Sequence, residues 1–462
     1  MEKFDFSKKQ KIFFSGIGGI SMSGLATLML EEGFEVYGSD SARSDLTVDL
    51  EKKGAVIYYG QDKDNIKSDI DLVVHSAAIK RDNPELITAE IMQKPILTRA
   101  EFLGSIMNNY KYSIGISGTH GKTTTTSMIS DIFLNAGIDP TISVGGIMPS
   151  INSNFRIGSK DCFITEACEY TNSFLSFYPD CAVILNCELD HTDFFKDEED
   201  FRNSFRLYCN NIKKGGKLVI NSSIKDIQYF ATEDAELITF GIEDQSKYVA
   251  KNITIIDDKL IKFDLYIDNN FISNIILNTI GKYNVSNALA AIAVGYEYGI
   301  DISIIKTTLE NFECTKRRFE VMGSIGGVKI ISEFAHHPTA IKFAIETARH
   351  LNPKKLWVIF QPHAYSRTKE FLYEFANVLS FADAVILTPI YAAREINTYN
   401  IYSKDIHDIL IKLGVESYNV DSFSEAEDLI LTKAESGDIA MAMGGGDIDK
   451  LAKDLMGISY EK

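Results

Sequence analysis

The chain has 462 residues, of which 45% are hydrophobic and 24% are charged; this composition is typical of a folded globular protein and excludes collagen, coiled coil and disorder. Acidic residues outnumber basic ones by 64 to 47, so the formal net charge is −17. Because an acidic surface repels a phosphate backbone, we expect no nucleic-acid partner. At roughly 150 residues per domain, the length predicts about three domains.

The first residues and the cysteines predict a reducing, cytoplasmic location. The start of the chain is polar, without the apolar run of a signal peptide. No stretch approaches the roughly 18 apolar residues of a membrane-spanning helix, so we expect no membrane partner. The six cysteines are too few for a disulfide framework and include no Cys-x-x-Cys pair of the kind that binds zinc. We expect reduced thiols in the core.

The first part of the chain, residues 1–111, alternates between strand and helix patterns. Strands are predicted at 11–15, 35–39 and 71–76, and helices at 20–32 and 84–93. Continuous apolar strands separated by helices predict a parallel sheet that helices cover on both faces.

A second unit is expected over residues 112–314. Its predicted elements are a strand at 114–117, a helix at 123–135, strands at 162–165 and 182–185, and an alanine-rich helix at 284–298. Alternating residues with turn signals over 247–280 predict an antiparallel meander or hairpin.

A third unit is expected over residues 315–462, again with alternating strands and helices. Its predicted strands are 328–332, 355–360, 384–387 and 439–443.

The strongest local motif is the glycine-rich segment 115–125, Gly-Ile-Ser-Gly-Thr-His-Gly-Lys-Thr-Thr-Thr, between a predicted strand and a predicted helix. Glycines let backbone N–H groups converge on phosphate oxygens, and the helix N-terminus and Lys122 add positive potential. A threonine hydroxyl after the lysine can bind Mg²⁺. The usual pattern is incomplete, since position 116 is Ile rather than Gly. We expect ATP to be held by Gly118, Thr119, His120, Gly121, Lys122, Thr123 and Thr124.

Carboxylates follow two other predicted strands of the same unit. Glu166 follows the strand at 162–165, and Asp190 and His191 follow the strand at 182–185. The carboxyl ends of parallel strands are where α/β sheets bind ligands, although carboxylates there are also common as helix caps. With Lys122, these residues predict an ATP–Mg²⁺ site.

A second glycine-rich loop, 16–24, follows the first predicted strand and nearly matches the dinucleotide pattern G-x-G-x-x-G, with Ser21 in the third position. Asp40 ends the second strand, where an acidic residue often accepts ribose hydroxyls. The loop predicts a diphosphate at a helix N-terminus and a ribose near Asp40. It does not distinguish NAD from another nucleotide, and a purely structural tight turn remains an alternative.

Taken together, these motifs resemble the Mur ligase family of peptidoglycan synthesis. The matching segments occur in the family's order along nearly the whole chain: 16–24, 118–125, 190–191, 281–287, 317–320, 336–339 and 360–369. Within the family, the segments 336–339, 360–363 and 444–447 are most similar to the branch that adds L-alanine to UDP-N-acetylmuramate.

The resemblance implies an α/β fold of three domains. These are a Rossmann-like N-terminal domain for the UDP-sugar, a central P-loop ATPase-type domain with a mainly parallel sheet, and a C-terminal Rossmann-like domain that binds the amino acid and closes the site. It also implies an ATP-dependent ligase, monomeric or weakly dimeric, that joins L-alanine to the lactyl carboxylate of UDP-N-acetylmuramate through an acyl phosphate.

The resemblance further implies residue roles. Substrate contacts are expected at Gly16, Gly18, Gly19, Ser21, Asp40, His75, Ser76 and His363. Metal ligands are expected at Thr123, Glu166 and His191, and contacts near adenine at Asn284 and Asn287. Catalytic roles are expected for Lys122, Glu166, His191, Arg317, Arg318, His336, His337 and Arg367, with Arg317 or Arg318 reaching the ATP phosphates. His336 is also a candidate cap of the helix that begins at Pro338.

Two departures from the family pattern lie near the expected amino-acid pocket. Ser332-Glu333-Phe334 stands where many relatives have Asp-Asp-Tyr, and Ala364 stands where relatives often have Arg. Two alternatives therefore stay open: a ligase that attaches a preformed peptide to the same nucleotide sugar, and a non-catalytic nucleotide-binding regulator. Retention of Lys122 and Glu166 argues against the regulator.

Overall fold

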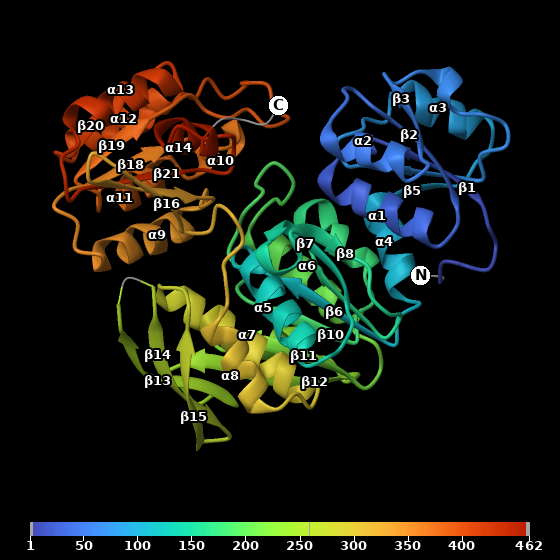
Figure 1. Ribbon diagram of the computed structural model, residues 1–462, viewed down its shortest axis with the longest axis horizontal. Helices are drawn as coiled ribbons and strands as arrows, with labels where there is room; N and C mark the ends of the chain where they lie inside the picture. The colour runs from blue at the N-terminus through green and yellow to red at the C-terminus, as the bar shows by residue number, and fades with distance from the viewer. Residues whose placement is uncertain (1–2, 258, 459–462) are drawn as a thin grey trace.

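Three separate sheets organise the chain into three α/β domains, as predicted (Figure 1). The computed structural model describes residues 3–257 and 259–458. The N-terminal domain, in blue, and the C-terminal domain, in orange and red, lie on opposite sides of the view, above the green and yellow middle domain.

The N-terminal sheet is parallel, with strand order β3-β2-β1-β4-β5. Its elements are β1 (Lys11–Ser15), α1 (Ile20–Glu31), β2 (Glu35–Asp40), α2 (Asp45–Lys52), β3 (Val56–Tyr59), β4 (Leu72–His75), α3 (Pro84–Ile91), β5 (Ile96–Thr98) and α4 (Arg99–Met107). The strand order reverses between β1 and β4. The loops after these two strands therefore meet at the crevice where such sheets bind ligands.

The middle sheet places β6 between β9 and β10, in the order β15-β14-β13-β12-β11-β10-β6-β9-β7-β8. Its elements are β6 (Tyr112–Ser117), α5 (Lys122–Asn135), β7 (Thr141–Met148), β8 (Ser153–Arg156), β9 (Cys162–Glu166), the 3₁₀ segment η3 (Tyr170–Ser176), β10 (Cys181–Ile184), α6 (Glu198–Cys209), β11 (Gly216–Asn221), β12 (Ala235–Ile242), β13 (Tyr248–Ile255), β14 (Ile261–Ile267), β15 (Asn270–Leu277), α7 (Lys282–Glu297) and α8 (Ile302–Glu310). The predicted antiparallel meander is confirmed as β13, β14 and β15.

The C-terminal sheet has the order β16-β17-β21-β18-β19-β20 and is parallel except for β16. Its elements are β16 (Glu320–Ile325), β17 (Val328–Glu333), α9 (Pro338–His350), β18 (Leu356–Phe360), α10 (Tyr365–Glu370), α11 (Leu372–Leu379), β19 (Ala384–Leu387), α12 (Ser403–Lys412), β20 (Glu416–Asn419), α13 (Phe423–Lys433), β21 (Ile439–Met443) and α14 (Asp449–Leu455). Every residue of β18, β19 and β21 is buried, which explains their continuous apolar sequences.

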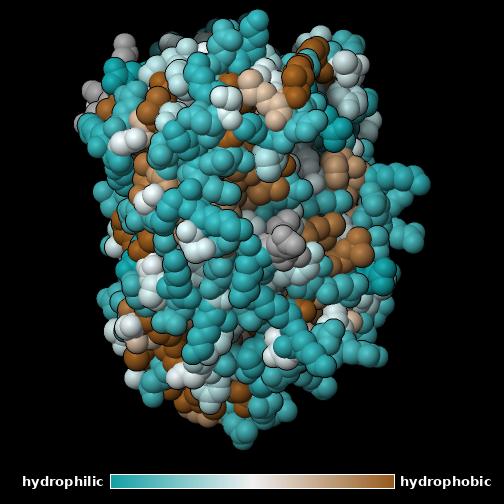
Figure 2. Space-filling model, turned by 90° about the vertical axis from the view of Figure 1, so that its right-hand side faces the viewer, coloured by the Kyte–Doolittle hydropathy of each residue, from teal (hydrophilic) through white to brown (hydrophobic). Residues whose placement is uncertain are grey.

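The surface and the cysteines follow from the composition. Figure 2 shows the side of the molecule that lies on the right in Figure 1, where hydrophobic residues are scattered among hydrophilic ones. Within the described residues, no helix is both long and apolar enough to cross a bilayer. All six cysteines are free thiols; Cys162, Cys181 and Cys209 are buried and the other three are partly buried.

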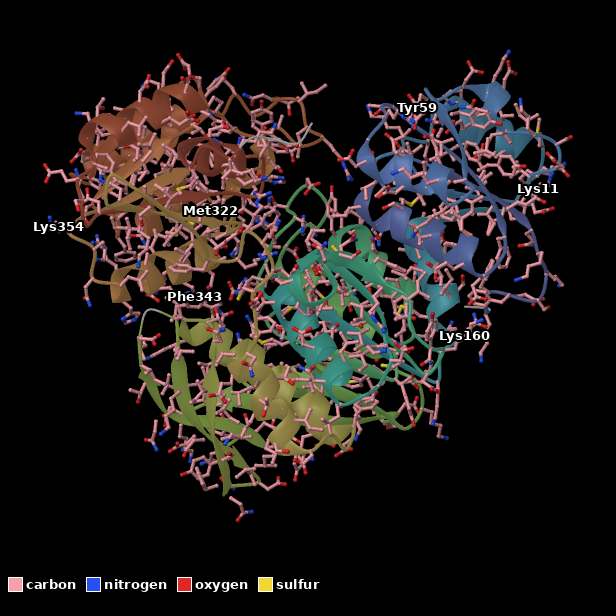
Figure 3. All side chains as sticks on the ribbon, viewed as in Figure 1. Lys11, Tyr59, Lys160, Met322, Phe343 and Lys354 are labelled. Carbon is pink, nitrogen blue, oxygen red and sulfur yellow. The ribbon has the colours of Figure 1, made fainter. Side chains whose placement is uncertain are left out.

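Close packing joins the N-terminal domain to the middle domain. Gly104 of α4 lies against the carbonyl of Ser176 in η3, so closely that an added methyl group would overlap the carbonyl oxygen. The same two domains are also joined by Lys160, labelled in Figure 3, which pairs with Glu32 at 3.0 Å. The absence of a side chain at position 104 therefore sets how closely these two domains approach.

Gly104→Ala tests this packing. Because the methyl group must displace the backbone of η3, we expect the variant to lose about 1–3 kcal/mol of unfolding free energy, measured by urea denaturation. Ile91→Ala, at a helix position that is 76% exposed, is the control and should change little. Equal unfolding midpoints for the two variants would contradict the packing account.

Candidate active site

A cavity of about 910 Å³ lies where the three domains meet. Ile20 reaches it from the N-terminal domain, and residues of the middle and C-terminal domains form most of its wall. The predicted residues that line it are Thr119, His120, Gly121, Lys122, Thr123, Thr124, Glu166, His191, Asn284, Asn287, Arg317, Arg318, His336 and His337. The other predicted site residues are not among its lining residues.

Two glycines shape the phosphate loop between β6 and α5. Gly118 has φ 144°, and a Cβ there would lie 3.0 Å from the Leu185 side chain. Gly121 has φ 87° at the N-terminus of α5, where a Cβ would lie 2.6 Å from Asn287 Oδ1. Only glycine fits both the backbone and the space. The loop thereby presents the N-terminus of α5 to the cavity, as anion binding requires.

A buried ion pair holds the lysine of this loop. Lys122 Nζ lies 3.0 and 2.9 Å from the two carboxylate oxygens of Glu169, which is fully buried, and it also donates to the carbonyl of Gly118. Burial opposes both charges, but their mutual attraction outweighs it, so the pKa of Lys122 is raised and that of Glu169 is lowered. Lys122 is therefore a fixed cation at the cavity wall.

Oxygen donors suited to Mg²⁺ lie beside two glycines of β7. Glu166 Oε1 accepts the Gly145 amide at 2.6 Å, and a Cβ at Gly146 would lie 3.4 Å from Thr123 Cγ2. The Thr123 hydroxyl and the Glu166 carboxylate are hard donors of the kind that Mg²⁺ prefers. His191, the third predicted ligand, has Nε2 3.6 Å from Glu169 and stacks on Tyr170.

The two arginines of the C-terminal domain point to different partners. Arg318 donates to the Thr123 hydroxyl at 3.2 Å and so reaches the phosphate loop. Arg317 donates instead to the carbonyls of Gly444 and Gly446, at 3.0 and 2.8 Å, inside its own domain. The sequence left this choice open, and the geometry selects Arg318 as the arginine beside the phosphate loop.

A second buried ion pair fastens the C-terminal domain to the middle domain. Arg367 Nε lies 2.8 Å from Asp190 Oδ1, and both side chains are almost fully buried. Burial opposes the charge of Asp190, but Arg367 outweighs it and holds the pKa of this carboxyl well below its usual range. The pair therefore contributes its full stability above about pH 4 and loses it only as the pH falls through the lower folded-state value.

His336 and His363 of the C-terminal domain are held neutral. Burial, and then the charge of Arg367, lowers the pKa of His336 well below its usual value and that of His363 to about 4. Their rings lie 5.7 Å apart. The α9 cap is His337, whose Nδ1 accepts the Thr339 amide, so the suggestion that His336 caps this helix is wrong. The Nδ1 of His336 instead pairs with the Phe334 carbonyl at 2.9 Å, so this side chain does not cap the helix.

Aromatic and amide side chains close the α7 side of the cavity. Tyr283 stacks on Phe343 of α9 with ring centroids 5.8 Å apart; Figure 3 labels Phe343 on the side of the C-terminal domain that faces the middle domain. Asn284 donates to Thr279 and to the Ile280 carbonyl, while Asn287 donates to Asn284 at 3.1 Å. The two asparagines therefore form a connected amide network under the phosphate loop.

The glycine loop of the N-terminal domain lies at the carboxyl ends of β1 and β4, apart from the residues that line the cavity. The Gly18 amide donates to Asp40 at 2.8 Å, and a Cβ at Gly16 would lie 2.9 Å from Ser76 Oγ. Gly19 begins α1 as its N-cap, and His75 ends β4 next to Ser76. The predicted substrate residues other than His363 thus gather at the reversal point of the sheet. Arg99, which donates to Ser21 at 3.1 Å, lies next to them.

Three charged residues at this site were not predicted. Glu169 follows β9, Glu188 follows β10 and Arg99 follows β5, so their position at strand ends was the signal that could have found them. Sequence alone did not distinguish them from ordinary helix caps or solvated charges, because their partners Lys122, Thr339 and Ser21 lie far away in the chain.

Three family models match the chain in order. They are "Mur ligase family, catalytic domain" over residues 11–111, "Mur ligase middle domain" over 116–295 and "Mur ligase, glutamate ligase domain" over 317–446.

Curated relatives match over the full length. The UDP-N-acetylmuramate–L-alanine ligase of Agathobacter rectalis is 49% identical over 99% of this chain and 100% of its own, and that of Clostridium acetobutylicum is 44% identical over 98% of both. Among solved structures, UDP-N-acetylmuramate-alanine ligase from Thermotoga maritima has a TM-score of 0.81 at 28% identity, with 97% of this chain and 98% of that chain covered. A murein peptide ligase from Psychrobacter arcticus, at 24% identity, has a TM-score of 0.70 over 97% and 98% and shares the fold.

Asp190→Asn tests the buried ion pair between the two domains. Because Arg367 is left as a buried charge without its counter-ion, the contact should weaken by about 3–5 kcal/mol. We expect a larger radius of gyration in small-angle X-ray scattering. Asp408→Asn, which breaks the exposed pair with Lys404, is the control and should leave the scattering unchanged. Identical scattering from both variants would contradict a fastening role for Asp190.

Proposed function

The chain belongs to the Mur ligase family, and we propose from this that it joins L-alanine to the lactyl carboxylate of UDP-N-acetylmuramate in peptidoglycan precursor synthesis, with conversion of ATP to ADP and phosphate. The full-length identity to ligases of that name supports the choice of substrates. The observation that carries the chemistry is the cavity, because it joins the phosphate loop to the C-terminal domain through the contact of Arg318 with Thr123.

We assign the three steps of substrate handling to the three domains. Residues 1–111 hold the UDP-sugar, 112–314 hold ATP, and 315–462 bring L-alanine and close the site. The crevice of Gly16, Gly18 and Asp40 suits a diphosphate and a ribose. Arg99 donates to Ser21 of this loop and also interacts electrostatically with Glu166, which lines the cavity, so it is placed to bind a carboxylate of the substrate.

A carboxylate resists attack by an amine, so the reaction requires its prior phosphorylation to an acyl phosphate. Lys122 and Arg318 supply positive charge where negative charge shifts during phosphoryl transfer. We place the adenine at the α7 end of the cavity, which Asn284 and Asn287 line. Because Arg318 comes from the C-terminal domain, this arrangement is complete only when that domain lies on the middle domain.

The oxygen donors Thr123 and Glu166, with His191, form the proposed Mg²⁺ site. A bound Mg²⁺ would neutralise phosphate charge during the transfer. The chain itself orients one of these ligands, because the Gly145 amide donates to Glu166 Oε1.

Amide formation requires that the amine of L-alanine lose its proton. His336 is neutral near pH 7 and lines the cavity, so it is placed to accept that proton. His337 also lines the cavity, and the His363 ring lies 5.7 Å from that of His336. Arg367 acts through Asp190 by holding the domain in place. Exclusion of water by the closed domain protects the acyl phosphate from hydrolysis.

The free thiols fit a reducing compartment, and we propose that the enzyme acts in the cytoplasm as a monomer or weak homodimer. A peptide-recycling activity is less favoured, because the full-length relatives at 42–49% identity carry the name UDP-N-acetylmuramate–L-alanine ligase. Retention of the buried Lys122–Glu169 pair in the cavity disfavours a non-catalytic regulator.

Lys122→Ala tests the proposed function. We expect phosphate release from ATP to depend on both UDP-N-acetylmuramate and L-alanine, and the variant to lose at least about 100-fold in rate, since one charge that stabilises the transition state is gone. Lys52→Ala, at an exposed position on α2, is the control. If Lys122→Ala kept most of the rate, the assigned phosphate site would be wrong.

A further inference from the structure

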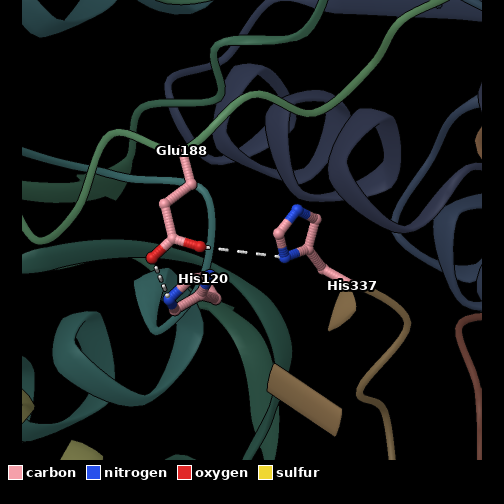
Figure 4. A group of neighbouring side chains, drawn as sticks. All are labelled: His120, Glu188 and His337. Atoms are coloured by element: carbon pink, nitrogen blue, oxygen red, sulfur yellow. Dashed lines mark ion pairs between the residues drawn. The ribbon is translucent and has the colours of Figure 1, made fainter. Parts of the chain in front are cut away.

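Three metal-ligating side chains converge at the contact between the middle and C-terminal domains. His120 comes from the phosphate loop, Glu188 follows β10, and His337 begins α9 (Figure 4). One oxygen of Glu188 lies 3.6 Å from His120 Nε2, and the other lies 4.0 Å from His337 Nδ1. One ligand atom from each of the three residues lies within 4.8 Å of the others.

His337 is oriented like a metal ligand. Its Nε2 lies 3.2 Å from the Leu189 carbonyl, and because a carbonyl only accepts, Nε2 carries the hydrogen. The lone pair is then on Nδ1, which lies 4.0 Å from Glu188 and accepts a long hydrogen bond of 3.4 Å from the Thr339 amide, so a metal would take the place of that bond. Histidine ligands commonly donate their other N–H to a backbone carbonyl in this way, which fixes the tautomer and the ring.

The ring nitrogens of His120 lack hydrogen-bond partners. Within the described residues, its Nδ1 has none, and its Nε2 is farther from Glu188 than a hydrogen bond allows. A cation bound at Nε2 would give this nitrogen a partner, and Glu188 and His337 would supply the other two ligand atoms.

We propose that His120, Glu188 and His337 form a binding site for a divalent transition metal of the Zn²⁺ class. Two imidazoles and one carboxylate with an open fourth position suit Zn²⁺, whereas Mg²⁺ prefers oxygen ligands. Ligand atoms around a tetrahedral zinc lie about 3.4 Å apart, so the observed distances need only a modest contraction. This site is distinct from the oxygen donors Thr123 and Glu166.

Occupation of this site would link the two domains. His120 and Glu188 belong to the middle domain and His337 to the C-terminal domain, where Thr339 already donates to Glu188 at 2.5 Å. The metal would draw the start of α9 toward the phosphate loop. Zn²⁺ is therefore expected to favour the closed arrangement of these domains and to slow turnover, because release of product requires opening.

Isothermal titration with Zn²⁺ alone, on the metal-free full-length protein without nucleotide, tests the proposal. We expect one Zn²⁺ per chain, with affinity reduced at least about tenfold in His337→Ala and in the isosteric Glu188→Gln. The matched controls His336→Ala, at the neighbouring, partly buried histidine, and Glu166→Gln, at the oxygen donors, should retain wild-type affinity.

Three results would overturn the site. They are no stoichiometric Zn²⁺ binding by the wild type, wild-type affinity in Glu188→Gln, and loss of binding in Glu166→Gln alone. X-ray absorption at the zinc edge gives an independent check on the wild-type complex. Two imidazoles with oxygen ligands support the assignment, and sulfur ligation from a cysteine would refute it.

Discussion

The buried pair of Asp190 and Arg367 is the contact on which the site depends. Burying two charges is costly, and such a pair is tolerated only where its geometry is well satisfied. Here it fixes where the C-terminal domain lies on the middle domain. In that placement Arg318, His336 and His337 reach the cavity, so the ion pair helps to bring phosphate-binding and amine-activating groups into one space.

The same logic holds at the phosphate loop. The chain carries a net charge of −17, yet the proposed substrates are anions. Local positive potential must therefore be built against the overall field. Glu169 keeps Lys122 charged and fixed, α5 directs its N-terminus at the cavity, and Arg318 adds a second cation from another domain. Global charge excluded nucleic acid but gave no information about these local sites.

Much of the fold was predictable because strand periodicity and burial are local properties. The strands β1, β6, β10, β18 and β21 read as apolar runs, and the meander of β13, β14 and β15 reads as alternation. Short strands with mixed sequences, such as β8 and β20, were not predicted. They owe their conformation to neighbours in the sheet rather than to their own residues.

The site was predictable where a motif fixes a residue's role and was not where the role depends on distant partners. The glycines and Lys122 follow from the loop pattern. The choice of Arg318 over Arg317, the pairing of Glu169 with Lys122, and the meeting of His120 with Glu188 and His337 depend on how domains pack. The role of Glu333 also depends on the folded structure. It replaces an Asp of the family pattern, and its carboxylate accepts hydrogen bonds from the Phe319 and Ala335 amides.

The central claim is that this cavity ligates a single small amino acid to UDP-N-acetylmuramate. The most direct measurement compares phosphate release from ATP, in the presence of UDP-N-acetylmuramate, with L-alanine, glycine, L-serine and a preformed peptide side by side. The account predicts the highest rate with L-alanine. A preference for the peptide, or a rate indifferent to the amine offered, would contradict it.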